Sequence, residues 1–157
     1  MINENLKLSG QLNIVLKDKA GNIKDQRELK NLVVQAGLEY IANRMKNDSS
    51  DTGGKAVMSH MALGSGTTAA ASGQTDLVSI LGSREALDST TLVSGSLHKI
   101  QYEASFEAGD ATGAVTEAGI FNASSSGDML CRTVFSVVNK AADDTMTVTW
   151  TITLSAT

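Results

Sequence analysis

The end of the chain carries its most regular pattern, a strict alternation of apolar and threonine side chains. The apolar positions are Met146, Val148, Trp150, Ile152 and Leu154, and threonine occupies each alternate position from 145 to 153. Because successive side chains of a strand point to opposite faces, the pattern predicts a core strand with one buried face. Burying each apolar side chain gains about 1.5–3 kcal/mol, which the cost of ordering the backbone, about 1–2 kcal/mol per residue, cancels. The strand therefore needs neighbouring strands and an opposing layer.

The same period of two recurs near the amino terminus. Apolar side chains occupy the even positions Leu6, Leu8, Leu12, Ile14 and Leu16, and the series is interrupted only at Gly10. The residues at 20–22, Ala-Gly-Asn, suit a turn, because glycine and asparagine tolerate positive φ. The segment from Ile23 to Leu29 is therefore predicted to return as the second strand of a hairpin. Its charged run at 24–28 indicates a solvated sheet edge.

From Asn31 the apolar period changes to steps of three and four residues. The apolar positions are Leu32, Val33, Ala36, Tyr40, Ile41 and Met45, which predicts a helix of roughly four turns. Asn31 is the predicted N-cap, since its side chain can accept a hydrogen bond from an unpaired backbone N–H. Gly37 is unfavourable inside a helix, and close approach of the helix to a sheet would explain it. The polar segment 47–54 is predicted to be a loop.

The remaining pattern predicts short strands and turns. The predicted strands are Ala56–Leu63, a hairpin of Arg84–Val93 with Leu97–Glu107, and a hairpin of Val115–Ala123 with Met129–Asn139. Thr75 is predicted to cap a brief helical turn that runs through Leu81. The fold class is therefore mainly β: an antiparallel two-sheet sandwich, jelly-roll-like, with one α-helix packed on it. We expect a single domain over 1–157, with 1–8 as an extended N-terminal arm.

Composition narrows the classes of function. The chain has 157 residues, 41% hydrophobic and 19% charged, with a net charge of −4 at pH 7, so we expect a folded protein without nucleic-acid binding. No apolar run approaches the length of about 20 residues that a membrane helix needs, so no membrane partner is expected. Cys131 is the only cysteine, and the first residues lack the apolar run of a signal peptide. We therefore expect a soluble protein made in a reducing cytoplasm.

Catalytic, cofactor and metal motifs are weak in this chain, and no site of these kinds is predicted. His60 and His98 lack partners at metal-ligand spacing, and Cys131 has no nucleophile signature around it. The loop Gly64–Thr68 resembles a phosphate-binding loop only superficially, because it lacks the lysine that follows the second glycine. Asp48 and Asp51 could offer oxygens to calcium, but no glutamate follows at EF-hand spacing.

Three glutamates are candidate carboxylates for glycoside cleavage: Glu103, Glu107 and Glu117. An aromatic content of 4% offers few platforms for sugar stacking. For Glu117 we expect a structural hydrogen bond at a bend instead. The protein is not expected to be an enzyme.

Five segments carry a family resemblance: Asn31–Leu38, Ser59–Thr68, Thr116–Ala123, Met129–Phe135 and Thr147–Ile152. Together they resemble small structural proteins of tailed bacteriophage particles, variously labelled capsid cement or decoration proteins or tail-fibre-like virion proteins. The similarity runs from about Asn31 to Ser155. It is more specific for a virion component than for its place on the particle.

The resemblance implies a non-enzymatic capsid cement or decoration protein that binds and stabilises assembled major capsid subunits. Such a protein would be made in the bacterial host cytoplasm and would lie on the outer surface of the capsid. The alternative is a tail, baseplate or fibre-attachment protein, with tail or fibre proteins as partners. A homo-oligomer, dimer or trimer, would multiply weak contacts into avidity. Met1–Leu8, with Leu6 and Leu8, is either an arm that extends a neighbour's sheet or a frayed terminus.

Overall fold

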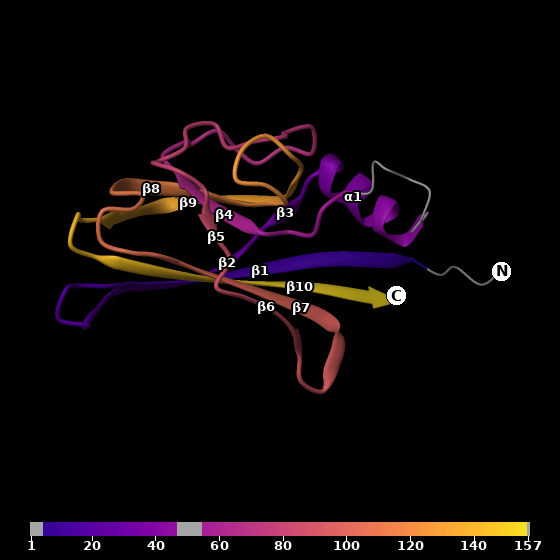
Figure 1. The fold of residues 1–157 in the computed structure, drawn as a ribbon, viewed down its shortest axis with the longest axis horizontal. Helices are drawn as coiled ribbons and strands as arrows, with labels where there is room; N and C mark the ends of the chain where they lie inside the picture. The colour runs from indigo at the N-terminus through magenta and orange to yellow at the C-terminus, as the bar shows by residue number, and fades with distance from the viewer. Residues whose placement is uncertain (1–4, 47–54, 157) are drawn as a thin grey trace.

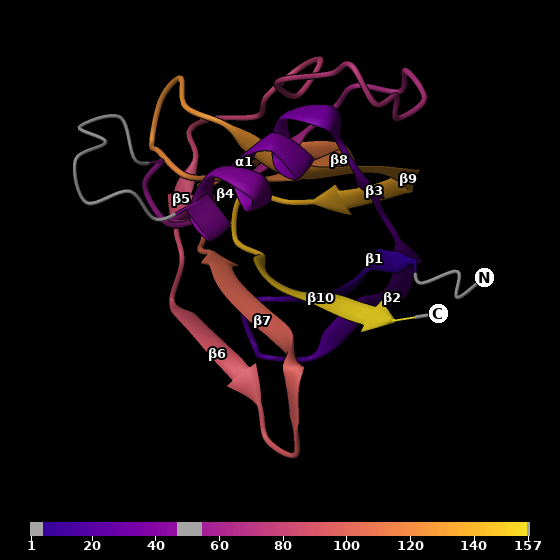
Figure 2. The same ribbon diagram turned by 90° about the vertical axis from the view of Figure 1, so that its right-hand side faces the viewer.

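The computed structural model describes residues 5–46 and 55–156, which form two five-stranded antiparallel sheets and one helix (Figure 1). Sheet A has the order β2 (Ile23–Lys30), β1 (Leu6–Lys17), β10 (Thr145–Ala156), β7 (Ser96–Phe106), β6 (Ser89–Val93). Sheet B has the order β3 (Leu32–Val33), β9 (Met129–Lys140), β8 (Gly113–Phe121), β4 (His60–Gly64), β5 (Glu85–Ala86). The sheets stack face to face (Figures 1 and 2), so the predicted β-sandwich with one helix is confirmed.

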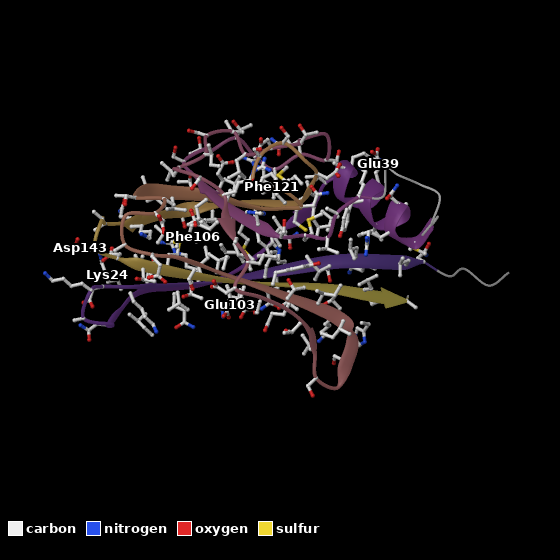
Figure 3. The ribbon with its side chains drawn as sticks, viewed as in Figure 1. Lys24, Glu39, Glu103, Phe106, Phe121 and Asp143 are labelled. Carbon is white, nitrogen blue, oxygen red and sulfur yellow. The ribbon has the colours of Figure 1, made fainter. Side chains whose placement is uncertain are left out.

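The inner face of sheet A supplies much of the core. β10 lies between β1 and β7, and its side chains Met146, Val148, Trp150 and Ile152 are buried, while Leu154 is half-buried. The alternate threonines lie on the opposite face. Figure 3 shows Phe106 of β7 between the two sheets and Glu103 of the same strand on the outer side of sheet A. Alternation at a period of two therefore places the core side chains along this sheet.

The N-terminal hairpin has the predicted strands and turn. The Asp18 carboxylate accepts hydrogen bonds from the backbone N–H groups of Ala20 and Asn22, both at 2.9 Å, and Gly21 has φ of 84°. Leu6 and Leu8 lie in β1 and pair with Ala156 and Leu154 of β10. The first four residues of the predicted arm lie outside the described residues.

Gly10 interrupts the apolar series because the Asn31 side chain occupies the space beside it. A Cβ atom on Gly10 would lie 1.7 Å from Asn31 Oδ1, which is a severe overlap. Glycine is therefore required at this position so that the buried Asn31 amide can pack against β1.

The helix prediction is partly wrong at its start. The helix α1 spans Gln35–Lys46, whereas Leu32 and Val33 form β3 and pair with Arg132 and Cys131 of β9. Asn31 is not the N-cap, because the two residues that follow it form a strand paired with β9 and the helix begins only at Gln35. The Gln35 N–H instead donates to the Ser72 carbonyl at 2.7 Å. The predicted close approach at Gly37 is confirmed, since a Cβ there would lie 2.2 Å from the Leu130 carbonyl oxygen.

Three further segments differ from the sequence predictions. The segment from Thr75 to Leu81 is not helical, because its backbone bonds to sheet B, with the Leu81 N–H donating to the Leu63 carbonyl. The predicted strand Ala56–Leu63 is shortened to β4. The predicted strand Arg84–Val93 is divided into β5 and β6, which pair with β4 and β7 and so belong to different sheets.

A smaller apolar cluster covers the other face of sheet B. It contains the buried side chains of Val34, Ala62, Phe121 and Met129, and Leu77 from the long β4–β5 connection packs on it. The Arg84 guanidinium lies 3.6 Å from the centre of the Phe121 ring. This connection therefore forms a third layer, seen along the top of Figure 1.

Trp150→Ala should lower the free energy of unfolding by about 3–5 kcal/mol, because it empties the largest fully buried side-chain volume of the core. Urea denaturation checks this value, with Thr151→Ala on the outer face as the control. A loss below about 1 kcal/mol would contradict burial of this face.

Gly10→Ala should destabilise the fold by about 1–3 kcal/mol through its overlap with the Asn31 amide. Gly10→Ala should cost less stability when it is added to Asn31→Ala than when it is added to the unmodified chain, because the amide with which it overlaps is then absent. Denaturation of all three variants tests the coupling, and additive losses would show that the two residues do not collide.

Candidate functional site

The most buried charges of the described chain form one ion pair on sheet B. Glu117 of β8 and Arg132 of β9 are both fully buried. Arg132 Nη2 and Nε donate to Glu117 Oε2 at 2.7 and 2.9 Å. The prediction that Glu117 makes structural hydrogen bonds is confirmed, but the residue lies within β8 beside a register shift and not at a bend.

The chain itself supplies the remaining partners of this pair. The Glu117 carboxylate accepts hydrogen bonds from the N–H groups of Gly66, Val78 and Ser79, at 2.9, 3.1 and 2.7 Å. Arg132 donates to the Gln74 side chain at 2.8 Å and to the Thr68 carbonyl at 3.0 Å. The pair therefore fastens the β4–β5 connection to sheet B.

The glycines of Gly64–Thr68 are explained by this carboxylate. A Cβ on Gly64 or on Gly66 would lie 2.6 or 2.4 Å from Glu117 Oε1. The loop therefore does bind an anion through backbone N–H, but the anion is the protein's own glutamate. Burial by itself would raise the pKa of Glu117, but the hydrogen bonds from Ser79, Arg132, Val78 and Gly66 outweigh it and hold the pKa below its ordinary value of 4.5.

The other candidate residues are dispersed. Cys131 lies in the core, where burial raises the pKa of its thiol, and His98 is exposed on β7. The His60 ring lies 2.8 Å from the Ser59 hydroxyl, and Glu107 is exposed at the end of β7. Among residues 5–46 and 55–156, no group of three or more His, Cys, Asp and Glu side chains could hold a metal ion. Asp48 and Asp51 lie outside the described residues.

An apolar cleft of about 550 Å³ opens between the inner face of sheet A and the helix α1. Its walls include Leu8, Leu154, Ile100 and Leu92 of sheet A and Ile41 and Met45 of α1. Figure 2 looks into this end, with α1 above and the strands β10, β7 and β6 below. Burial raises the pKa of Tyr102, which also lines the cleft, to about 12, so its hydroxyl is neutral at pH 7. The cleft suits apolar side chains.

Burial decreases steadily along the inner face of sheet A toward this end. In β10, Trp150 and Ile152 are buried and Leu154 is half-buried. In β1, Leu12 is buried, Leu8 is half-buried and Leu6 is 69% exposed. The apolar face of sheet A therefore continues past the layer that covers it.

A second hollow, of about 530 Å³, lies beside β1 where β2 ends. The β1–β2 ladder stops at the pair Gln11–Lys30, and the hollow is lined by residues 7–11 and 28–31 together with Thr153. Leu8 lines both hollows, so the cleft and this notch adjoin one another at the free end of β1.

Sequence reasoning did not find the Glu117–Arg132 pair or the cleft. A signal for the pair was present, because an acidic and a basic residue interrupt the apolar runs of the two strands of one predicted hairpin. The cleft had no such signal, because it depends on how far sheet B extends over sheet A.

No protein-family model, no curated protein and no solved structure matches this chain. Of the part of the chain that the structure describes, the helix α1 has 12 residues and is not long and apolar enough to cross a membrane.

Glu117→Gln should lower the free energy of unfolding at pH 7 by about 3–5 kcal/mol, because it leaves the buried Arg132 without its counter-charge. Since folding lowers the pKa of Glu117, its carboxylate stabilises the fold above pH 4.5, and this contribution is lost as the pH falls through the folded-state pKa. Urea denaturation from pH 7 to pH 3 should show a smaller loss toward acid in the variant. Glu103→Gln, on the outer face of sheet A, is the control, and equal effects would contradict the role of the pair.

Proposed function

We propose that this chain is a non-enzymatic structural protein of a tailed bacteriophage particle. In this role it is a capsid cement protein that binds assembled major capsid subunits on the outer surface of the capsid. Two observations support the proposal: the family resemblance of Asn31–Ser155, and the open end of the sandwich, where the apolar cleft lies between sheet A and α1. The resembling segments fall mainly in sheet B, which includes the Glu117–Arg132 pair and gives the molecule a rigid body.

The observation that carries the proposal is the exposed apolar surface around the cleft. Leu6 is 69%, Met45 76%, Val57 59% and Leu92 56% exposed, and all of them lie at the same end of the molecule. Contiguous apolar surface on a folded protein marks a site where another protein binds. A partner protein that covers this end would complete the layer that sheet B does not supply.

Cementing a capsid needs many copies and only modest affinity for each contact. The particle repeats the same subunit contacts by symmetry, so weak contacts of a dimer or trimer combine into avidity. The apolar end would supply the contact, and the threonine-rich outer face of sheet A would stay in solvent. This arrangement accounts for a chain that is rigid, modestly charged and polar on one broad face.

Imaging of purified virions by cryo-electron microscopy tests the proposal. We expect density for this chain at repeated positions on the capsid surface, with the cleft facing a capsid subunit. Recombinant chain added to capsids that lack it should restore that density and raise the temperature at which the capsids open. Density confined to the tail would replace the cement role with the tail or fibre role, and particles without the chain would overturn both.

A further inference from the structure

Among the described residues, no strand pairs with the Leu6–Ser9 part of β1 on the side away from β10. The Gly10 carbonyl accepts a hydrogen bond from the Asn31 N–H at 3.2 Å, so the backbone polar groups of Gly10 point away from β10. The β1–β10 register runs without interruption from Leu6 to Lys17, and in such a ladder the backbone groups alternate between the two sides. The N–H and C=O groups of Leu6 and Leu8 therefore point to the same side as those of Gly10, where no strand of the described chain pairs with them.

The other sheet edges are protected. β2 carries five charged residues in eight, and its Arg27 donates to Ser136 Oγ at 2.7 Å and to the Val137 carbonyl at 2.8 Å, which ties it to β9. β3 and β5 have two residues each. β6 has a register shift between Leu92 and Val93. Charge, short length and bulges are the means by which proteins prevent strand addition. The Leu6–Ser9 edge has one charged residue, Lys7, and its register with β10 has no bulge.

The two faces of this edge differ in chemistry. On the inner face, Leu6 and Leu8 present the exposed margin of the apolar surface. On the outer face lie Lys7 and Lys30. Lys30 pairs with Gln11, and Gln11 lies four residues after Lys7 in the same strand, so the two lysines share one face of the sheet. Of the described residues that line the two hollows, the charged ones are Lys7, Glu28, Lys30 and Arg44, three cations and one carboxylate. The described lining of the two hollows is therefore net cationic, in a chain whose net charge is −4.

We propose that the free edge of β1 at Leu6–Ser9 binds an extended segment of a partner protein by strand addition, and that apolar and acidic residues alternate in this segment. Its backbone would pair with Leu6 and Leu8, and its apolar side chains would pack against theirs. Its carboxylates would lie on the outer face beside Lys7 and Lys30. The inference deepens the proposed function, on which it rests for the nature of the partner.

Charge favours such a segment over a second copy of this chain. Antiparallel pairing of two β1 edges around Leu6 or Leu8 would bring the two Lys7 side chains to the same face near the two-fold axis. Like charges close together across a strand pair are destabilising, whereas an acidic segment meets opposite charge.

The test uses the isotope-labelled full chain and a short synthetic peptide in which valine alternates with aspartate. We expect saturable NMR shifts at the amides of residues 5–9, and weaker binding at high salt. Leu6→Lys, which places a charge on the inner face at a largely exposed position, should weaken binding by about tenfold or more. Ile23→Lys is the matched control, because Ile23 is a similarly exposed apolar residue, 59% exposed, which pairs with Lys17 at the other end of β1, and this variant should bind as the unmodified chain does.

A second variant tests the charge. Lys7→Glu should lose the acidic peptide and gain affinity for a peptide with lysine in place of aspartate. Absence of binding by the acidic peptide, or equal losses in Leu6→Lys and Ile23→Lys, would overturn the proposal. A dimer in analytical ultracentrifugation that Leu6→Lys dissociates would overturn it in favour of a second copy.

Capsid binding measured in parallel separates this inference from the proposed function. Capsid binding that Leu6→Lys leaves intact, together with no peptide binding, would remove strand addition and keep the cement role. Peptide binding without capsid association would remove the cement role and keep strand addition.

Discussion

Burial of one face of β10 is the interaction on which the rest of the structure depends. This strand lies between β1 and β7, and its buried side chains from Met146 to Ile152 require a second layer, which sheet B supplies. The second layer does not cover the whole inner face of sheet A, since Trp150 and Leu12 are buried whereas Leu154 is half-buried and Leu6 is 69% exposed. The apolar face of sheet A therefore outruns its cover. The same alternation that builds the core also produces the exposed surface at the open end.

The Glu117–Arg132 pair solves a different problem, which is how a long connection without regular structure stays on the sheet. A buried ion pair contributes little net stability unless its remaining hydrogen bonds are satisfied, and here backbone and side-chain groups from residues 66–79 satisfy them. The glycine loop, the pair and the small cluster around Phe121 form one unit. Figure 3 shows Phe121 of this unit above sheet B, and none of its residues lines the apolar cleft. The Glu117–Arg132 pair therefore fastens the β4–β5 connection to sheet B without contacting the residues of the apolar cleft.

Much of the fold could be predicted from the sequence, because a period of two is a local property of the chain. The alternations around Trp150 and Leu12 predict the two long strands β10 and β1, and the residues at 20–22 predict the turn from β1 to β2. The errors occurred where a distant contact overrides local preference. Asn31 has the chemistry of an N-cap, yet β9 pairs with the two residues after it. Thr75–Leu81 has a helix start signal, yet Glu117 takes its N–H groups. The cleft could not be predicted at all, since the relative lengths of two stacked sheets follow from tertiary packing.

The sheet edges of this protein differ in how well they are protected against pairing with another strand. Free edges are a hazard, and charge, shortness or a bulge protects β2, β3, β5 and β6. At the end of β1, the backbone N–H and C=O groups of Leu6 and Leu8 point to the sheet edge away from β10. The apolar cleft and Lys7 lie beside them. Such an edge is a liability in a protein that acts alone. In the role proposed above, a partner subunit would supply the missing strand at this edge, so the buried parts of β1 and β10 would stabilise the monomer while the exposed ends of the same two strands would determine docking.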